Sequence, residues 1–382
     1  MKGFLFMSEK IRYNAPVIAA VLLIVILLLI PTGFEGAASY TGSDRCAAKV
    51  ISCDNSAIID TGLVRQGEQV CKVKLLGGLF KGQEPEAVNM LNGSLEQDKI
   101  FAEGNKAYVL VSYRDDEILS VTMVDHYRLN NELVLAAVFV VFLVAFAGKT
   151  GVRAVLSFIV TVLSIWKLLV PLYLKGSDPI ITGGVIVLLL SVMIIALVYG
   201  FDRRTAAASL GVGAGIITTA VTGMIFTDVF KIHGAVMSFS ESLLYNGYND
   251  LNLTKIFMAS IFIGSSGAVM DLAVDITSAV HEVIQKKPDI SRIEAVKSGL
   301  NVGRAAMGTI TTTLLLAYSG SCCALLMVFM AQGTPLGNIL NYKYVAAEIV
   351  HTVVGSFGLV SVAPLTALAC GFLLTKKESK SA

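Results

Sequence analysis

Charged residues are scarce in this sequence. Asp, Glu, Lys and Arg make up 15% of its 382 residues, whereas a typical soluble protein carries about 25%. Hydrophobic residues make up 55%, and the mean hydropathy is +0.72. This composition excludes an ordinary soluble fold. Its apolar runs of membrane-spanning length predict a polytopic α-helical membrane protein.

The signatures of several chemistries are absent as well. Net charge is only +2, and no basic face alternates with aromatic residues, so nucleic-acid binding is not expected. The six cysteines do not form a disulfide framework, and no ligand spacing is typical of a metal site. A Ser–His–Asp triad, a phosphate loop and a dinucleotide fingerprint are missing too. We therefore expect no cofactor, and an intramembrane enzyme would lack a visible nucleophile and base.

Eight apolar segments are long enough to cross a bilayer. The first, residues 15–32, is interpreted as an uncleaved anchor, with a cleaved signal peptide as the alternative. The other seven are residues 131–148, 152–174, 179–200, 205–227, 253–283, 299–331 and 343–375. The predicted domains are a tail with the first helix (1–35), a polar domain (36–130) and a seven-helix transmembrane domain (131–382).

The residue pattern of the polar domain differs from that of the rest of the chain. Polar and β-branched residues alternate in it, and turn-like stretches such as "CDNS" and "NGS" separate the runs. This alternation predicts a small β-barrel or β-sandwich. Its three cysteines, Cys46, Cys53 and Cys71, are an odd set that allows one disulfide outside the cell.

The distribution of Lys and Arg predicts the orientation of the spans, because cytoplasmic loops are enriched in both. Segments expected in the cytoplasm carry Lys2, Lys10, Arg12, Lys149, Arg153, Arg203, Arg204, Lys286, Lys287, Arg292, Lys297, Lys376, Lys377 and Lys380. The short outer loops carry only Lys175, Lys231, Lys255 and Lys343. Both termini are therefore expected in the cytoplasm, and residues 36–130 outside it.

Two short motifs occur twice in the second half of the chain. "SLGVGAG" at 209–215 resembles "GLNVGRA" at 299–305, and "GSSGAV" at 264–269 resembles "GSFGLV" at 355–360. The nearly equal offsets predict a parallel tandem repeat, in which spans 5–6 are duplicated as spans 7–8. The alternative is chance, because small-residue motifs are common in membrane helices.

Glycine and serine gather near the middle of spans 6, 7 and 8. Such residues weaken a helix and can expose backbone groups to a substrate, as in the discontinuous helices of transporters. The alternative is that they only permit close helix packing. The predicted helix breaks are at Gly264, Ser265, Ser266, Gly267, Ser319, Gly320, Gly355, Ser356 and Gly358.

Two aspartates, Asp271 and Asp275, lie one helical turn apart in span 6 and therefore share a face. A carboxylate in the membrane must be paired, protonated or bound to a cation. We expect Asp275 to pair with Arg304, while Asp271 lines a polar cavity and binds a proton, a cation or a polar substrate. The alternative is a static ion pair between spans 6 and 7.

Further polar residues accompany these charges. Asn301, Thr309 and Thr312 make span 7 polar and are assigned to the same substrate or ion path. Glu348 and His351 lie one turn apart near the outer end of span 8. They form either a second polar station or an interfacial pair in contact with water.

Several of these stretches together resemble the YibE/F-like family of bacterial membrane proteins. The resemblance rests on residues 72–94, 264–283, 298–320, 346–350 and 355–368. Family motif positions are occupied by Asp271, Asp275, Arg304, Gly308, Thr309 and Glu348, whereas Ala305 and Thr312 stand where an aspartate and an asparagine are expected. The resemblance implies a multi-pass protein of the bacterial cytoplasmic membrane and assigns no substrate.

The function expected from these features is a transporter or permease for a small polar or ionic substrate, coupled to a proton or cation through the aspartates. The alternative is a membrane-anchored sensor or assembly protein whose external domain binds a ligand or partner. The expected partners are the lipid bilayer and an unknown small molecule or ion, with a homo-oligomer as a further expectation.

Overall fold

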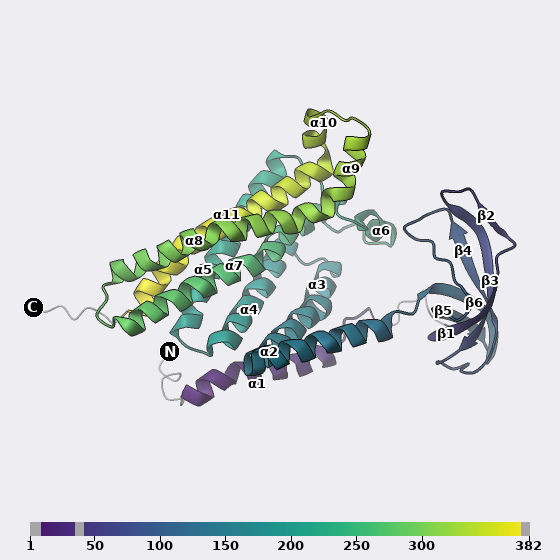
Figure 1. The fold of residues 1–382 in the computed structure, drawn as a ribbon, viewed down its shortest axis with the longest axis horizontal. Coiled ribbons are helices and arrows are strands. Elements are labelled where there is room, and N and C mark those ends of the chain that lie inside the picture. Colours follow the sequence, from purple (N-terminus) through teal and green to yellow (C-terminus); the bar gives the residue numbers. More distant parts are fainter. Residues whose placement is uncertain (1–8, 35–41, 376–382) are drawn as a thin grey trace, which may run out of the picture. The chain divides into compact units, whose positions relative to one another are not determined.

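The computed structural model describes residues 9–34 and 42–375 (Figure 1). The chain divides into two compact units, Phe34–Phe146 and Met1–Gly33 with Ala147–Ala382. Residues 1–8 and 376–382, which include the ends of both expected cytoplasmic tails, lie outside the described residues, as do residues 35–41.

The smaller unit contains a closed β-barrel. Its strands are β1 (Ser43–Asp54), β2 (Ile58–Asp60), β3 (Arg65–Leu75), β4 (Glu86–Asn92), β5 (Lys106–Arg114) and β6 (Glu117–His126). Strand β1 pairs with both β3 and β5, which closes the ring β1-β5-β6-β4-β3, and β2 adds to β3 outside it. All pairs are antiparallel except β4–β6. This is the strand order of an OB-fold, a five-stranded Greek-key barrel.

Alternation of polar and apolar residues produces the barrel core, as the sequence predicts. On β3, Cys71 and Val73 point inward and are fully buried, while Lys72 between them is exposed. Two polar side chains, those of Asn89 and Gln69, also lie inside. Gln69 is bonded to the segment after β4. Its Nε2 donates to Phe101 O (2.9 Å), and its Oε1 accepts from Phe101 N (3.0 Å). These bonds satisfy the buried amide and fasten the segment between β4 and β5 to the barrel.

The helices are α1 (Glu9–Leu29), α2 (Leu129–Ser164), η3 (Ile165–Leu169), α3 (Val170–Leu174), α4 (Pro179–Tyr199), α5 (Arg203–Val229), η4 (Gly234–Val236), α6 (Ser240–Tyr245), α7 (Leu253–Lys286), α8 (Arg292–Ser319), η5 (Gly320–Cys322), α9 (Cys323–Ala331), α10 (Leu336–Asn341) and α11 (Lys343–Leu373). Among the described residues, five helical runs are long and apolar enough to cross a membrane, or six if the bent pair α8 and α9 forms one span.

The difference from the eight expected spans has two sources. The expected spans 131–148 and 152–174 form one helical run, Leu129–Leu174, which is interrupted only at Gly148 (φ 54°). The described apolar part of the first span, Tyr13–Leu29, is also shorter than the other candidate spans. The observed fold is thus a helical membrane unit joined to a small β-barrel.

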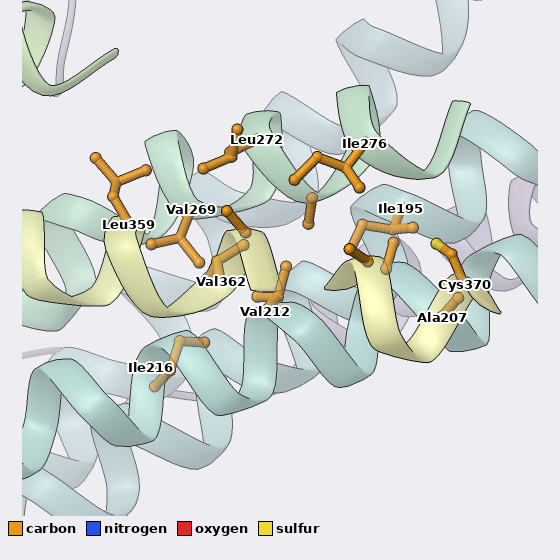
Figure 2. Close-up of a cluster of buried hydrophobic side chains, with 14 of the residues drawn as sticks. Ile195, Ala207, Val212, Ile216, Val269, Leu272, Ile276, Leu359, Val362 and Cys370 are labelled. Atoms are coloured by element: carbon orange, nitrogen blue, oxygen red, sulfur yellow. The ribbon is translucent and has the colours of Figure 1, made fainter. Parts of the chain in front are cut away.

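Four long helices, α5, α7, α8 and α11, build the main core of the membrane unit. Figure 2 shows apolar side chains of three of them, such as Val212 from α5, Leu272 from α7 and Val362 from α11, and α8 adds Ala295 and Leu314 to the same cluster. Glycines bring α5 and α11 especially close. Gly211 lies against Thr366, and Gly358 lies against Thr219. Small residues at such crossings allow backbones to approach, which is how membrane helices gain packing energy.

Two of the three predicted helix breaks are wrong. Helix α7 runs unbroken through Gly264, Ser265, Ser266 and Gly267, and α11 runs unbroken through Gly355, Ser356 and Gly358. These small residues serve packing instead: a Cβ at Gly355 would lie 3.1 Å from Ser265 Cβ. Only the third break occurs. Helix α8 ends at Ser319, a short 3₁₀ turn starts at Gly320, and α9 continues at an angle of 64°.

Two polar anchors fasten the peripheral helices to this core. Arg153, which the sequence pattern assigned to the cytoplasmic side, is buried and donates to Tyr13 O and Leu197 O (3.0 Å each). It thereby joins α1, α2 and α4. Asp178 caps α4 and pairs with Lys255 Nζ on α7 (2.5 Å). The Lys255 ammonium lowers the pKa of Asp178 below its usual range.

The contact between α5 and α11 can be tested at Gly211. Gly211→Ala places a Cβ against Thr366, whose Cα is 3.1 Å from the new atom. We expect this overpacking to destabilise the protein by about 1–3 kcal/mol. The control Gly184→Ala, where nothing lies within 4 Å of the added Cβ, should be neutral or stabilise by up to about 1 kcal/mol, because alanine favours helix. Thermal unfolding in detergent measures both, and equal melting temperatures would contradict the packing interpretation.

Candidate functional site

A polar stripe runs along the face of α7 opposite the core. Its exposed members are spaced by three or four residues and therefore share one face: Gly264, Gly267, Asp271, Asp275 and Ser278. The opposite face carries fully buried apolar residues, such as Leu272 and Ile276. Helix α7 lies between α4 and α8 (Figure 1), so the stripe is bordered by these two helices.

Asp271 and Asp275 have no compensating partner in the part of the chain that the structure describes. Neither carboxylate takes part in an ion pair within 4.0 Å or in a hydrogen bond there. The two groups lie within electrostatic reach of each other. Two like charges at this spacing oppose each other's ionisation.

The expected pair between Asp275 and Arg304 is not formed. Among the described residues, no ion pair within 4.0 Å involves Arg304, and its side chain is exposed on α8. The reason is the rotation of the two helices. Their contact is made by Gly303, where a Cβ would lie 3.1 Å from Ile276 Cδ1. Arg304 follows Gly303 and Asp275 precedes Ile276 in the sequence. Each charged residue therefore lies about 100° away from the contact around its own helix.

Helix α8 presents a second polar stripe. Asn301, Arg304, Thr309 and Thr312 are all exposed on it. The hydroxyls of Thr309 and Thr312 donate to carbonyls of their own helix, Ala306 O and Gly308 O, at 2.9 Å each. The two threonines are thus satisfied locally. The sequence analysis assigned these four residues and the two aspartates to one path, and the four lie on one face of α8.

The second polar station, Glu348 and His351, belongs to a cluster contributed by α7, α8 and α11. The rings of His351 and Tyr318 meet edge to face, with centroids 4.5 Å apart. Ser260 Oγ lies 3.3 Å from His351 Nε2. Glu348 lies within electrostatic reach of Tyr318. Sequence reasoning found two members of this cluster but did not find Ser260 and Tyr318.

Gly264 connects this cluster to the α7 stripe. A Cβ on Gly264 would lie 2.5 Å from the Tyr318 hydroxyl and 3.5 Å from His351 Cε1. The glycine therefore makes room for the tyrosine to cross the face of α7. The signal for this contact was the glycine itself, because a small residue in a helix often marks the close approach of another group.

The other end of the stripe meets the turn between α4 and α5. The Tyr199 hydroxyl donates to Val274 O (2.6 Å) and lies 2.6 Å from Ser278 Oγ. Asp275 lies within electrostatic reach of Tyr199. Arg204, held by Asp202 at 2.7 Å, stands 4.9 Å from the Tyr199 ring centroid. Tyr199 thus borders the end of the stripe next to Asp275, and Tyr318 contacts the other end at Gly264.

The described residues contain no group of three or more His, Cys, Asp or Glu side chains that could hold a metal ion. Two carboxylates with nearby hydroxyls and carbonyls can instead exchange a proton or bind a single hard cation, both of which oxygen groups accommodate.

The comparisons with known proteins cover this region. The YibE/F-like protein family matches residues 135–376, a range that includes both polar stripes and the His351 cluster. No curated protein and no solved structure matches the chain. The match spans more than half of the 382 residues. The chain therefore belongs to the family of YibE/F-like proteins.

Proposed function

We propose that this protein is a membrane transporter or permease for a small polar or ionic substrate, and that Asp271 and Asp275 take up the coupling proton or cation. One observation carries the proposal: two carboxylates lie exposed on a helix of membrane-spanning length, without a partner among the described residues. A carboxylate at the centre of a membrane helix costs about 2.5–3.5 kcal/mol on insertion scales. Charged residues with such a cost are rare in membrane helices and usually serve a function.

The proposed path runs along α7 between two polar stations. The inner station is the aspartate pair, bordered by Tyr199. The outer station is the cluster of His351, Tyr318 and Ser260. Each station contains titratable groups, so a proton can be received at one and released at the other. On the neighbouring helix α8, Arg304 and the exposed threonine hydroxyls would contact an anionic or polar substrate in this path.

An internal repeat supports a special role for the aspartates. We propose that α5 and α7 are duplicated as α8 and α11, since the paired helices start at nearly the same offset. Val362 and Thr366 then correspond to Asp271 and Asp275. In the second copy these positions pack tightly against glycines of α5, namely Gly215 and Gly211. The first copy has exposed carboxylates there, so the proposed duplication places different side chains on corresponding faces of α7 and α11.

The proposed topology has eight crossings. The run Leu129–Leu174 would cross twice because Gly148 allows it to reverse, and α8 with α9 would form one crossing. Both termini are then cytoplasmic and the β-barrel lies outside the cytoplasm. The Lys and Arg distribution supports this orientation. We further propose the bacterial cytoplasmic membrane as the location.

The role of Asp271 can be tested without knowing the substrate. A hydrophobic carbodiimide reacts with protonated carboxyl groups in apolar surroundings. We expect wild-type protein to be modified at Asp271, and the Asp271→Asn variant to lose this modification and its proton or cation flux in proteoliposomes. Because the side chain is exposed, folding stability should change by no more than about 0.5 kcal/mol.

The matched control is Glu282→Gln, on the same helix but paired with Lys286 at 2.7 Å. It should retain both modification and flux. Flux that survives Asp271→Asn at the wild-type level would overturn the transport proposal, as would the absence of carbodiimide modification at Asp271.

The second candidate function is an assembly or sensor protein. It is favoured by the exposed polar face of α8, because Arg304 there complements the aspartates of α7. A second copy or another membrane chain could then bring the opposite charges together. In this case the basic groups of the other chain neutralise the carboxylates in the complex, and the carboxylates bind no transported ion.

Arg304→Ala distinguishes the two functions. Because Arg304 is exposed, its replacement should change the stability of one chain by about 0.5 kcal/mol or less, and not by the 3–5 kcal/mol expected for a broken buried pair. In a transporter, the variant retains its oligomeric mass and loses flux. In an assembly, it loses the partner in light scattering, while the neighbouring Thr313→Val control retains it. A loss of stability of several kcal/mol would contradict the exposed placement of Arg304.

The orientation has its own test. Single cysteines are introduced at Lys81, in the segment between β3 and β4, and at Asp289, in the segment between α7 and α8, on a background that lacks the native cysteines. A membrane-impermeant thiol reagent added to intact cells should label position 81, and it should label position 289 only after the membrane is opened. Labelling of position 289 in intact cells would exclude the proposed topology.

A further inference from the structure

Two of the three cysteines in the β-barrel lie directly opposite each other. Cys53 on β1 pairs with Cys71 on β3 in the antiparallel register, and their sulfur atoms are 2.7 Å apart. Opposite residues of antiparallel strands have Cα atoms about 4.5–5.5 Å apart, a separation that a disulfide spans. Strand pairing alone thus brings the two thiols together, and no backbone movement is needed to join them.

An irregularity in β1 places Cys53 on the inner side of the barrel. Val50 is buried opposite Val73. The register then shifts between Val50 and Ser52, so one residue of β1 has no counterpart on β3. This bulge changes the phase of the alternation. As a result Cys53 packs against the barrel core, and Ser52 faces outward.

The third cysteine does not compete for this pairing. Cys46 lies earlier on β1, is buried, and stands opposite Val109 of β5. The odd number of cysteines in the domain therefore resolves into one adjacent pair and one packed thiol.

We propose that Cys53 and Cys71 form a disulfide in the native protein, made by exchange with a small-molecule or protein disulfide outside the cytoplasm. The proposal rests on the proposed orientation of the barrel. The Cys53 thiolate attacks the oxidant's disulfide, which forms a mixed disulfide and releases one thiol. The Cys71 thiolate then attacks the Cys53 sulfur and releases the second thiol. Two electrons and two protons pass from the protein to the oxidant.

The order of these steps follows from exposure. Cys71 is fully buried, whereas Cys53 is only half-buried. Burial, together with the neighbouring Cys53, raises the pKa of Cys71 to about 12. Because the thiolate is the attacking species, the accessible Cys53 reacts first. Cys71 reacts once the mixed disulfide is held against it.

The bond would restrain a small pocket. The cysteines are 18 positions apart, and the segment between them carries β2 and the turn to β3. Residues 60 and 62–65 of this segment line a pocket of about 230 Å³ together with Leu91, Ser94, Leu95, Asp98 and Ile100. A crosslink at the base of the hairpin limits the opening of that wall. The oxidation state of the pair would therefore control the shape of the pocket.

The test uses the full chain in membranes isolated under an acid quench. Free thiols are blocked with N-ethylmaleimide in denaturant, the sample is reduced, and the released thiols are alkylated with iodoacetamide. Peptide mass spectrometry should find the second label on Cys53 and Cys71 and the first label on Cys46. Finding the first label on Cys53 and Cys71 would overturn the proposal.

A second arm identifies which premise has failed. Purified reduced protein is treated with oxidised glutathione. If the pair was reduced in the membranes but forms here, the orientation is at fault, and the proposed topology fails with it. If the pair does not form in either arm, the disulfide geometry is at fault, and the transport proposal is untouched.

The effect on the pocket is measured by trypsin cleavage after Arg65, on the pocket wall. A reductant should accelerate cleavage of wild type and of the matched control Cys46→Ser about tenfold, which corresponds to about 1.4 kcal/mol of lost protection. The Cys53→Ser/Cys71→Ser variant should be cleaved at the fast rate with or without reductant. Equal cleavage rates for the oxidised wild type and this double variant would contradict the proposed restraint on the pocket.

Discussion

The close approach of α5 and α11 is the contact on which the membrane unit depends. Gly211 and Gly358 leave no room for a side chain, because Thr366 and Thr219 occupy the space that a Cβ would need. In a bilayer, helices gain little from the hydrophobic effect and depend on such packing. This contact and the apolar core shared with α7 turn the apolar face of α7 inward, including Val269, Leu272 and Ile276 (Figure 2). The opposite face of α7, which carries the aspartates, is thereby left uncovered.

The polar groups of this uncovered face lie along one stripe of α7, which is the path that we propose for the proton or cation. Tyr199 and Tyr318 stand at its two ends, and the aspartate pair lies between them. Two carboxylates one turn apart cannot both remain ionised in apolar surroundings without a counter-charge. A proton, a cation or a basic group from another chain must therefore supply it, and this requirement underlies both candidate functions. The β-barrel adds a second chemistry, because its strand register juxtaposes two thiols, and the segment between them in the sequence contributes one wall of a pocket.

Much of the fold could be predicted from local pattern. Alternation along Arg65–Leu75 predicted a barrel strand, and long apolar runs predicted membrane helices, because both depend on spacing along one chain segment. Membership of the YibE/F-like family followed from contiguous motifs and is confirmed by the match over residues 135–376. Near Ser319 and Gly320, where a break was expected, α8 ends and a 3₁₀ turn begins. The breaks at Gly264 and Gly355 were predicted wrongly, because a glycine in a helix can serve either bending or packing, and only its neighbours in space distinguish the two.

The sequence by itself determined the membrane class, the inserted β-domain, the family and the presence of two costly carboxylates on one helix face. Those properties depend on composition and periodicity, which are local. Only the tertiary structure decided which groups surround the carboxylates. Arg304 was the expected partner of Asp275 because the sequence places both residues at a similar depth in the membrane. The contact between α7 and α8 is instead made by Gly303 and Ile276. The rotation of each helix is set by the packing of its whole buried face, to which residues far apart in the sequence contribute. For the same reason Tyr318 joins His351, and Cys53 faces Cys71, across distances in the chain that no local pattern spans.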